Sequence, residues 1–177
     1  GMDVDFVGHP LIDEIELRNR TFEVKREKVI ALLPGSREQE IKHILPEILN
    51  IQAQFPDYHF IIGKAPGKTK AFYQTRFAMG NALVSDEGTY KLLSRSQAAL
   101  VGSGTATLET ALLKVPQVVC YKANGLSVRI ARSLIKVPYI SLVNLILDKP
   151  AVKELIQSEL NAETLVFELK RILNDEK

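Results

Sequence analysis

Apolar residues along the chain form short continuous runs, separated by longer stretches in which they recur every three or four positions. Short β-branched runs between turn residues are typical of buried strands, whereas the longer spacing is typical of helices. The pattern predicts strands at Val29–Leu33, Phe60–Ile62, Ala82–Val84, Ala98–Val101, Gln117–Tyr121 and Tyr139–Ile140. It predicts helices at Glu38–Gln54, Thr69–Phe77, Gly88–Arg95, Thr105–Lys114, Leu126–Ile135, Ala151–Glu159 and Ala162–Leu173.

This alternation predicts an α/β fold, a Rossmann-like parallel sheet with helices on both faces. We expect residues 1–28 to be a tag remnant, Gly1 and Met2, followed by an interdomain linker or strand. Residues 29–160 would form the Rossmann-like domain and 161–177 a C-terminal helix. Ligands of such sheets bind at the carboxyl ends of strands, where loops lead into helix N-termini.

The composition is that of an ordinary globular domain, with 177 residues, 46% hydrophobic and 25% charged. These values exclude a disordered or collagen-like chain. No apolar run is long enough to predict a membrane-spanning helix. The only cysteine, Cys120, lies in an apolar run and is predicted to be a buried free thiol. His9, His43 and His59 are scattered, so we predict no metal site.

The net charge of +2 is unevenly distributed. Between Glu109 and Asp148 no acidic residue occurs, whereas five cations do: Lys114, Lys122, Arg129, Arg132 and Lys136. This segment carries +5, so the rest of the chain carries −3. A segment of one sign indicates an anionic partner such as phosphate, nucleic acid or lipid headgroups. The alternative is a solvated face with ordinary lysines and arginines.

The loop after the first predicted strand has the features of a phosphate site. Gly35 permits a tight turn, and Ser36 with Gln39 is expected to form a capping box at the start of the next helix. Arg37 then lies beside the positive end of the helix dipole, where it would clamp a phosphate in a bidentate manner. The alternative is a well-capped turn with an exposed arginine.

A second loop combines small residues with a carboxylate. Gly102, Ser103 and Gly104 follow a predicted strand and would let a ligand approach the backbone closely. Thr105 and Glu109 are four residues apart and so share a helix face, where the carboxylate suits two ribose hydroxyls. The alternative is that Glu109 only complements the helix dipole.

Several familiar sites are disfavoured. The second loop approaches the G-x-G-x-x-G fingerprint, but Thr107 replaces the third glycine and the later acidic residue is missing, which disfavours a nicotinamide dehydrogenase. The segment from Gly63 to Lys70 has three residues between its glycines where Walker A needs four. We therefore predict a basic surface loop there. Asp3 and Asp5 form a D-x-D sequence that we attribute to chance, and no G-x-S-x-G is present.

Four segments in order resemble the second half of the lipid-A-disaccharide synthase family. They are Phe6–Asp13, Leu32–Arg37 with Glu40 and Ile41, Gly102–Glu109, and Tyr139–Leu145. The resemblance extends from Val4 over essentially the whole chain. It implies the C-terminal half of a GT-B fold, in an inverting, metal-independent glycosyltransferase of lipopolysaccharide biosynthesis. Such an enzyme is cytoplasmic and peripherally associated with the bacterial inner membrane.

The resemblance also implies a reaction. UDP-2,3-diacylglucosamine would donate its sugar to 2,3-diacylglucosamine 1-phosphate, forming the β-1,6 disaccharide phosphate and releasing UDP. Residues 29–160 would be the nucleotide-sugar-binding domain, and the protein's own N-terminal domain would supply the acceptor site and the general base. The present chain is therefore expected to be inactive alone. Neither a cofactor nor a nucleic acid partner is implied.

Roles for individual residues follow from the same resemblance. Arg37 and Asn144 match residues near the diphosphate and the transferred sugar, and are the implied catalytic residues. Without the resemblance, Asn144 would more simply be a turn residue. Glu109 matches the ribose-binding acid. Val143 departs from the family, which usually has proline there. The other implied nucleotide-binding residues are Gly35, Ser36, Gly102, Ser103, Gly104 and Thr105.

The basic segment would give Arg129, Arg132 and Lys136 to an anionic membrane surface. The alternative there is an amphipathic helix packed on the sheet. Two other functions stay open. One is another enzyme of UDP-N-acetylglucosamine, such as a 2-epimerase, which would need carboxylates and histidines around its cleft that this half does not show. The other is a non-enzymatic nucleotide-binding or membrane-surface module.

Overall fold

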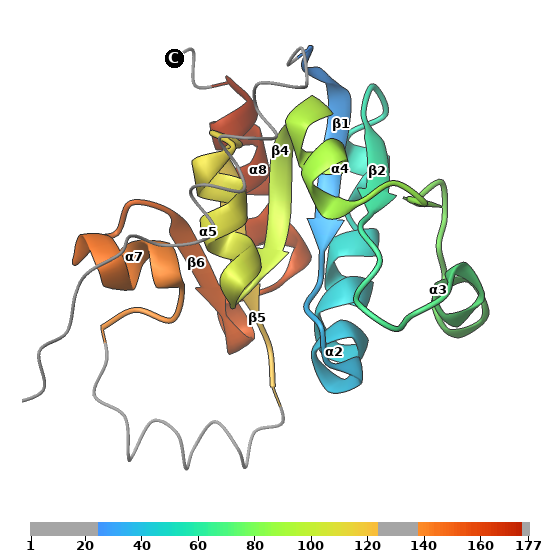
Figure 1. Ribbon diagram of the computed structural model, residues 1–177, viewed down its shortest axis with the longest axis horizontal. Coiled ribbons are helices and arrows are strands. Elements are labelled where there is room, and N and C mark those ends of the chain that lie inside the picture. The colour runs from blue at the N-terminus through green and yellow to red at the C-terminus, as the bar shows by residue number, and fades with distance from the viewer. Residues whose placement is uncertain (1–24, 124–137, 175–177) are drawn as a thin grey trace, which may run out of the picture.

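The computed structural model describes residues 25–123 and 138–174. These residues form a six-stranded parallel sheet with helices on both faces (Figure 1), which confirms the predicted α/β fold. The strands are β1 (Glu27–Leu33), β2 (His59–Ile62), β3 (Leu83–Val84), β4 (Ser96–Gly102), β5 (Gln117–Tyr121) and β6 (Lys153–Ile156). The helices are α2 (Glu38–Leu49), α3 (Lys70–Arg76), α4 (Thr89–Arg95), α5 (Thr105–Leu112), α7 (Leu142–Leu147) and α8 (Ala162–Asn174).

The strand order, β3-β2-β1-β4-β5-β6, reverses direction between β1 and β4. The chain winds outward from β1 to β3, returns to pair β4 with β1, and then winds outward the other way. Leu33 pairs with Val101 near the carboxyl ends of these two strands. The loops that follow β1 and β4 therefore lead to opposite faces of the sheet, which is the arrangement that opens a ligand crevice in α/β proteins.

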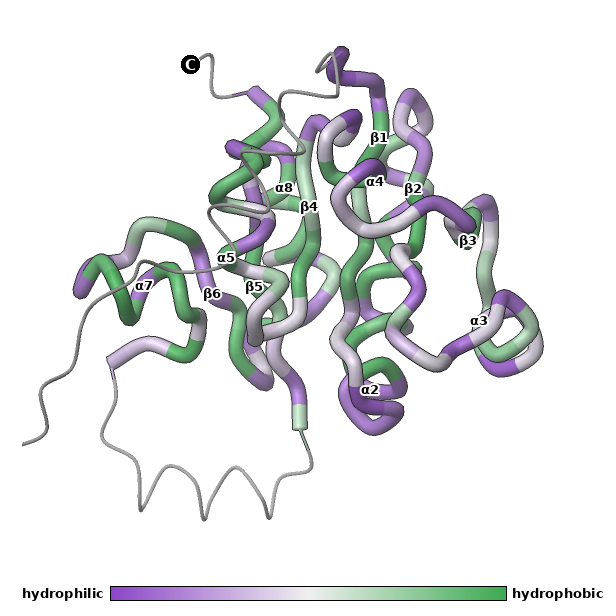
Figure 2. The backbone as a smooth tube through the Cα atoms, viewed as in Figure 1, coloured by the Kyte–Doolittle hydropathy of each residue, from purple (hydrophilic) through white to green (hydrophobic). Residues whose placement is uncertain are grey.

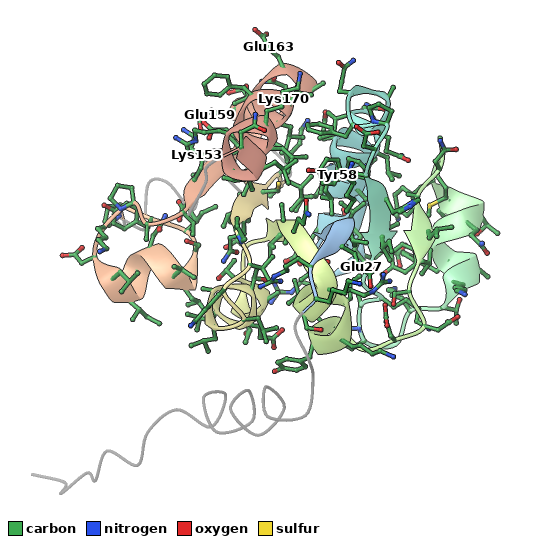
Figure 3. The ribbon with its side chains drawn as sticks, turned by 90° about the horizontal axis from the view of Figure 1, so that it is seen from above. Glu27, Tyr58, Lys153, Glu159, Glu163 and Lys170 are labelled. Atoms are coloured by element: carbon green, nitrogen blue, oxygen red, sulfur yellow. The ribbon has the colours of Figure 1, made fainter. Side chains whose placement is uncertain are left out.

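Alternation along β1 explains how the sheet holds a layer on each face. Successive residues of a strand point to opposite faces. Ile30 and Leu32 belong to one buried cluster with residues of α2 and α8, while Ala31 belongs to another with residues of α4. Figure 3 shows this layering from above, with α8 on one side of the sheet and α4 and α5 on the other. Hydrophobic residues run along β1 and β2 inside the molecule (Figure 2).

Two predicted elements near the C-terminus are wrong. Tyr139–Ile140, predicted as a strand, lies in a bend before α7, and Ala151–Glu159, predicted as a helix, contains β6 and the 3-10 turn η2 (Gln157–Glu159). β6 is an edge strand held by pairing with β5, Cys120 opposite Leu155, and Leu155 is its only fully buried residue. A strand stabilised mainly through its backbone leaves little apolar alternation in the sequence.

The predicted helix at Glu38–Gln54 is shorter than expected, because α2 ends at Leu49 and a 3-10 turn, η1 (Gln52–Gln54), follows. The predicted helix at Leu126–Ile135 lies outside the described residues. Cys120 is fully buried, as predicted, and its burial raises the pKa of the thiol to about 12.

Candidate functional site

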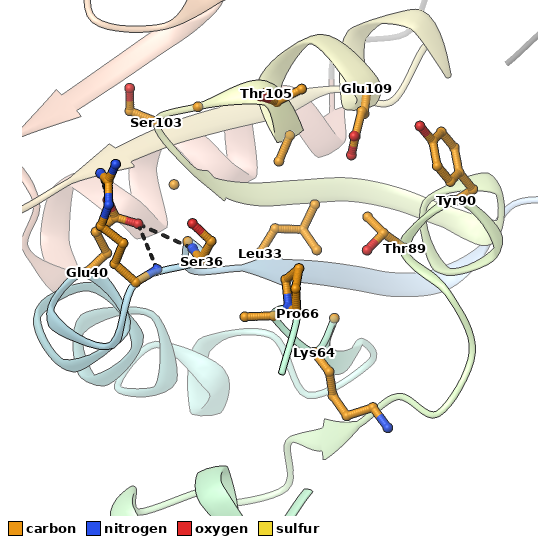
Figure 4. A pocket seen from close by; sticks show the side chains of 17 residues that line it. Leu33, Ser36, Glu40, Lys64, Pro66, Thr89, Tyr90, Ser103, Thr105 and Glu109 are labelled. Carbon is orange, nitrogen blue, oxygen red and sulfur yellow. Dashed lines mark hydrogen bonds and ion pairs between the residues drawn. The ribbon is translucent and has the colours of Figure 1, made fainter. Parts of the chain in front are cut away.

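A cleft of about 520 Å³ opens at the carboxyl ends of β1 and β4 (Figure 4). Its walls come from the loops after β1, β2 and β4 and from the first residues of α4 and α5. The structure brings to this cleft eight of the residues singled out from the sequence: Gly35, Ser36, Arg37, Gly102, Ser103, Gly104, Thr105 and Glu109. The two loops predicted to carry the chemistry thus share one cavity.

The first wall is the turn from β1 into α2. Gly35 adopts a φ of +111°, a conformation that favours glycine. The helix begins at Glu38, as predicted, but its N-cap is Arg37 instead of Ser36, and Glu40 takes the third helical position. The Glu40 carboxylate accepts hydrogen bonds from the backbone N–H groups of Ser36 (3.2 Å) and Arg37 (3.3 Å). The predicted capping box of Ser36 and Gln39 is therefore wrong.

Arg37 stands at the mouth of the cleft. Its side chain is 83% exposed, and Nη1 lies 3.0 Å from Glu40 Oε1. An exposed ion pair of this kind contributes only about 0–1 kcal/mol to stability. The Arg37 guanidinium can therefore leave Glu40 at little cost in free energy. Arg37 remains accessible to an anion in the cleft.

The second wall is the turn from β4 into α5. Gly104 is the N-cap of α5, with φ +150° and ψ −164°. Without a side chain, it offers no side-chain acceptor to the first N–H groups of the helix, and only its carbonyl oxygen accepts, from the N–H of Thr107 at 3.1 Å. Glu109, one turn further on, lines the cleft together with Thr105 (Figure 4), as their spacing predicted. The wall therefore presents a helix N-terminus and, beside it, a carboxylate.

The loop after β2 contributes a third wall. Gly63, Lys64, Ala65 and Pro66 line the cleft, although the sequence predicted only a basic surface loop. Ala65 is buried and its N–H donates to the Tyr73 hydroxyl at 2.9 Å, which fixes the backbone of this loop. The difference arises because β2 lies directly beside β1 in the sheet, so the two loops leave it side by side.

Asn144 is not among the residues that line the cleft. Its side chain is buried, and Nδ2 donates to Val152 O and Glu154 Oε1, both at 2.9 Å. Its Oδ1 accepts from the N–H of Val152 at 2.9 Å. These bonds tie α7 to the segment that leads into β6. These hydrogen bonds occupy both polar atoms of the Asn144 side chain, and its contact with a diphosphate or sugar stays a prediction.

Glu154 of β6 was missed from the sequence, since it fell within a wrongly predicted helix. Its carboxylate accepts from the N–H groups of Ile140 (3.1 Å) and Ser141 (2.9 Å), from Ser141 Oγ (2.7 Å) and from Asn144 Nδ2. Ser103 in the cleft donates its hydroxyl to Ile140 O at 2.7 Å. Glu154 thus anchors the segment against which the β4–α5 loop rests.

A family model described as lipid-A-disaccharide synthetase matches residues 1–177. The chain belongs to this family. The lipid-A-disaccharide synthase of Psychromonas ingrahamii is 38% identical over 97% of this chain and 49% of its own length. That of Syntrophus aciditrophicus is 38% identical over 98% of this chain and 49% of its own length. The chain thus spans about half the length of the curated relatives it matches.

A solved structure supports the fold of this lipid-A-disaccharide synthetase domain. The crystal structure of the glycotransferase of kitacinnamycin superposes with a TM-score of 0.53 and 17% sequence identity. The superposition covers 87% of this chain and 37% of that one. At this level of identity the likeness concerns the fold alone.

Arg26, just before β1, holds the synthetase domain together at the opposite end of the sheet. Its guanidinium donates to the carbonyl oxygens of Leu93 (2.8 Å), Ser96 (2.7 Å), Leu113 (2.9 Å) and Lys114 (3.2 Å). These acceptors lie at the C-termini of α4 and α5, where a cation also complements the helix dipoles. Burial lowers the pKa of the Arg26 guanidinium. The two helices fixed in this way present their N-termini to the cleft.

The predictions about the basic segment, a membrane-spanning helix and a metal site concern parts of the synthetase domain outside the cleft. Arg129, Arg132 and Lys136 lie outside the described residues. Lys122, in the same basic segment, pairs with Glu47. Among residues 25–123 and 138–174, no helix is long and apolar enough to cross a membrane, and no three His, Cys, Asp or Glu side chains gather in a metal-binding group.

Proposed function

We propose that this chain is the donor-binding half of a lipid-A-disaccharide synthase. The complete enzyme would transfer 2,3-diacylglucosamine from UDP-2,3-diacylglucosamine to 2,3-diacylglucosamine 1-phosphate, forming a β-1,6 disaccharide phosphate and UDP. Family membership supports this reaction, and one observation carries the role of this half: the loops after β1 and β4 line a single cleft. The acceptor site and the general base would lie in the remainder of the longer protein.

The donor diphosphate is proposed to bind between the two walls. The N-terminus of α5, capped by Gly104, offers backbone N–H groups and the positive end of a helix dipole. Arg37 faces the same cleft from the β1 side. Negative charge grows on the departing UDP in the transition state. Donors held in place before the reaction stabilise that charge most effectively, because they need not reorganise.

The ribose is proposed to bind at Glu109. Glu109 and Thr105 lie one turn apart on the same side of α5, and both line the cleft. A carboxylate accepts hydrogen bonds from two adjacent hydroxyls, which is the arrangement on a ribose ring. A ribose at Glu109 would place its diphosphate toward Gly104, in the direction of the helix N-terminus.

Because the proposed donor and acceptor are both lipids, the enzyme is proposed to act at the cytoplasmic side of the bacterial inner membrane. The basic segment that contains Arg129, Arg132 and Lys136 is proposed to contact anionic headgroups there. Sedimentation of the full-length protein with anionic liposomes tests this proposal. A double charge reversal, Arg129→Glu with Arg132→Glu, would abolish binding, whereas unchanged binding would favour an amphipathic helix packed on the sheet.

Kinetics of the full-length protein test the proposed reaction. Incubation with the UDP-linked donor and the lipid acceptor would yield the disaccharide phosphate and UDP, and R37A would lower kcat by about tenfold or more, since one preorganised donor supplies about 2–4 kcal/mol. Arg76→Ala is the matched control, because Arg76 pairs with Glu38 and does not line the cleft. Unchanged kcat and KM for R37A would contradict the role of Arg37. Epimerisation of UDP-N-acetylglucosamine would instead support the 2-epimerase alternative.

A further inference from the structure

The cleft contains an anion that belongs to the protein itself, the carboxylate of Glu40. Oε2 accepts from the N–H groups of Ser36 and Arg37, at 3.2 and 3.3 Å (Figure 4). Oε1 lies 3.0 Å from Arg37 Nη1. The Glu40 side chain is 22% exposed and lines the cleft. One carboxylate thus takes up three of the donors that the β1 side of the site offers to a phosphate.

The backbone is shaped to keep this carboxylate in place. A Cβ atom on Gly35 would lie 2.5 Å from Glu40 Oε2 and 2.9 Å from Glu40 Cβ. Glycine at this position therefore leaves room for the Glu40 side chain as well as for the turn. The Glu40 oxygens stand where a phosphate would sit on α2, against backbone N–H groups at the helix N-terminus.

We propose that Glu40 is a place-holder carboxylate, which keeps Ser36 N–H, Arg37 N–H and the Arg37 guanidinium occupied until a donor phosphate replaces it. The inference rests on the proposed function, since it concerns the same cleft. Two anions cannot share these donors without strong repulsion, so donor binding exchanges one anion for another. The same exchange in reverse would help UDP leave after transfer.

Comparison with two other carboxylates near helix N-termini, Glu154 and Glu38, supports a specific role for Glu40. Glu154 also sits at a helix N-terminus, but its four hydrogen bonds all go to the segment before α7 and to Asn144, away from the cleft lining. Glu38 lies in the same turn of α2 as Glu40, yet it pairs with Lys42, Lys68 and Arg76. Of these three carboxylates, only Glu40 holds donors that open into the cleft.

Anion affinity of the Glu40→Gln chain tests the proposal. The amide oxygen of glutamine still accepts the backbone hydrogen bonds, while the negative charge is removed. We expect the Kd for pyrophosphate and for UDP to fall by about threefold or more, because a like charge has been removed from the binding position. Glu38→Gln removes the same charge from the same helical turn and is expected to change these constants by less than about 1.5-fold, since its charge is exposed and screened.

Unchanged or weaker pyrophosphate binding by E40Q, or an equal gain in E38Q, would overturn the place-holder role. A readout on the unaltered chain accompanies the variants: the amide resonances of Ser36 and Arg37 are expected to move as pyrophosphate is added. Absence of this movement would also overturn the proposal. If E40Q gains affinity for pyrophosphate while neither chain binds UDP, the place-holder role stands and the nucleotide-sugar function fails.

Discussion

A Cβ atom on Gly102 would lie 3.0 Å from the backbone nitrogen of Gly35 and 3.1 Å from the carbonyl carbon of Pro34. The loops after β1 and β4 are therefore in direct backbone contact beneath the cleft. Because both neighbours are main-chain atoms, they cannot give way as a flexible side chain would. The common floor of the two walls depends on this contact.

Gly102→Ala is expected to push these loops apart. Overpacking against fixed atoms costs about 1–3 kcal/mol, and we expect a loss of that size in the free energy of unfolding, together with weaker UDP binding. Urea unfolding and calorimetric titration measure the two effects. Gly88→Ala is the control, since a Cβ there meets no atom within 4 Å and Gly88 has a φ of −66°. Equal effects of both substitutions would show that the contact between the loops is unimportant.

Asn144→Ala is expected to act on stability. The substitution leaves the backbone N–H and carbonyl of Val152 without their Asn144 partner, while Glu154 Oε1 keeps its two hydrogen bonds from Ser141. Loss of buried hydrogen bonds of this kind costs about 1–3 kcal/mol for each group left unsatisfied, so the free energy of unfolding should fall by about 2–4 kcal/mol. Asn81→Ala, at an exposed position, is the control. A variant of normal stability that lost turnover in the full-length enzyme would instead support the predicted direct role of Asn144.

Arg26→Met is expected to loosen the ends of α4 and α5 that lie away from the cleft. The methionine keeps an unbranched apolar side chain but removes all four donations to carbonyl oxygens. Hydrogen bonds from a charged donor contribute about 1.5–3 kcal/mol each in favourable cases, and we expect a total loss of at least about 2 kcal/mol in urea unfolding. Lys25→Met, at the exposed neighbouring position, should change stability little. A similar loss in both variants would contradict the assigned role.

Glu38 should make stability depend on pH in the acid range. Hydrogen bonds from Lys42 and Lys68 are the largest causes that lower the pKa of Glu38 from 4.5 to about 2. Because the folded-state pKa lies below the unfolded value, the stabilisation is fully present above pH 4.5 and is lost as the pH falls toward about 2. The difference in unfolding temperature between the unaltered chain and Glu38→Gln should therefore shrink over this range. A difference that stays constant would exclude this ionisation as its source.

The central strands could be predicted because each is a short continuous run of apolar residues. Val118, Val119 and Cys120 are all fully buried, and a continuous apolar run records a strand covered on both faces. β6 has no such apolar run. It is an edge strand with one fully buried residue, and it depends on backbone pairing with β5. The start of α2 at Glu38 was predicted, but its capping was not, because the Glu40 carboxylate accepts from the N–H groups of Ser36 and Arg37.

The supporting residues of the site were harder to predict than its two loops. Gly35 and Gly104 each follow a predicted strand, and glycine at such a position predicts a tight turn or a close approach of a ligand to the backbone. Arg26 and Glu154, in contrast, bind main-chain groups: the acceptors of Arg26 lie 67 to 88 residues away, and the donors to Glu154 lie in the segment before α7. No local pattern encodes such partners. The place of Lys64 and Pro66 in the cleft likewise depends on the strand order, which brings β2 beside β1.

Titration of the ¹⁵N-labelled chain with UDP, followed residue by residue in amide spectra, tests the donor-binding assignment most directly. The account predicts saturable shifts at Gly104, Thr105 and Ala106 on one wall and at Ser36 and Arg37 on the other, with Gly88 unmoved. Shifts confined to one wall, shifts centred elsewhere on the sheet, or no saturable shift at all would contradict it.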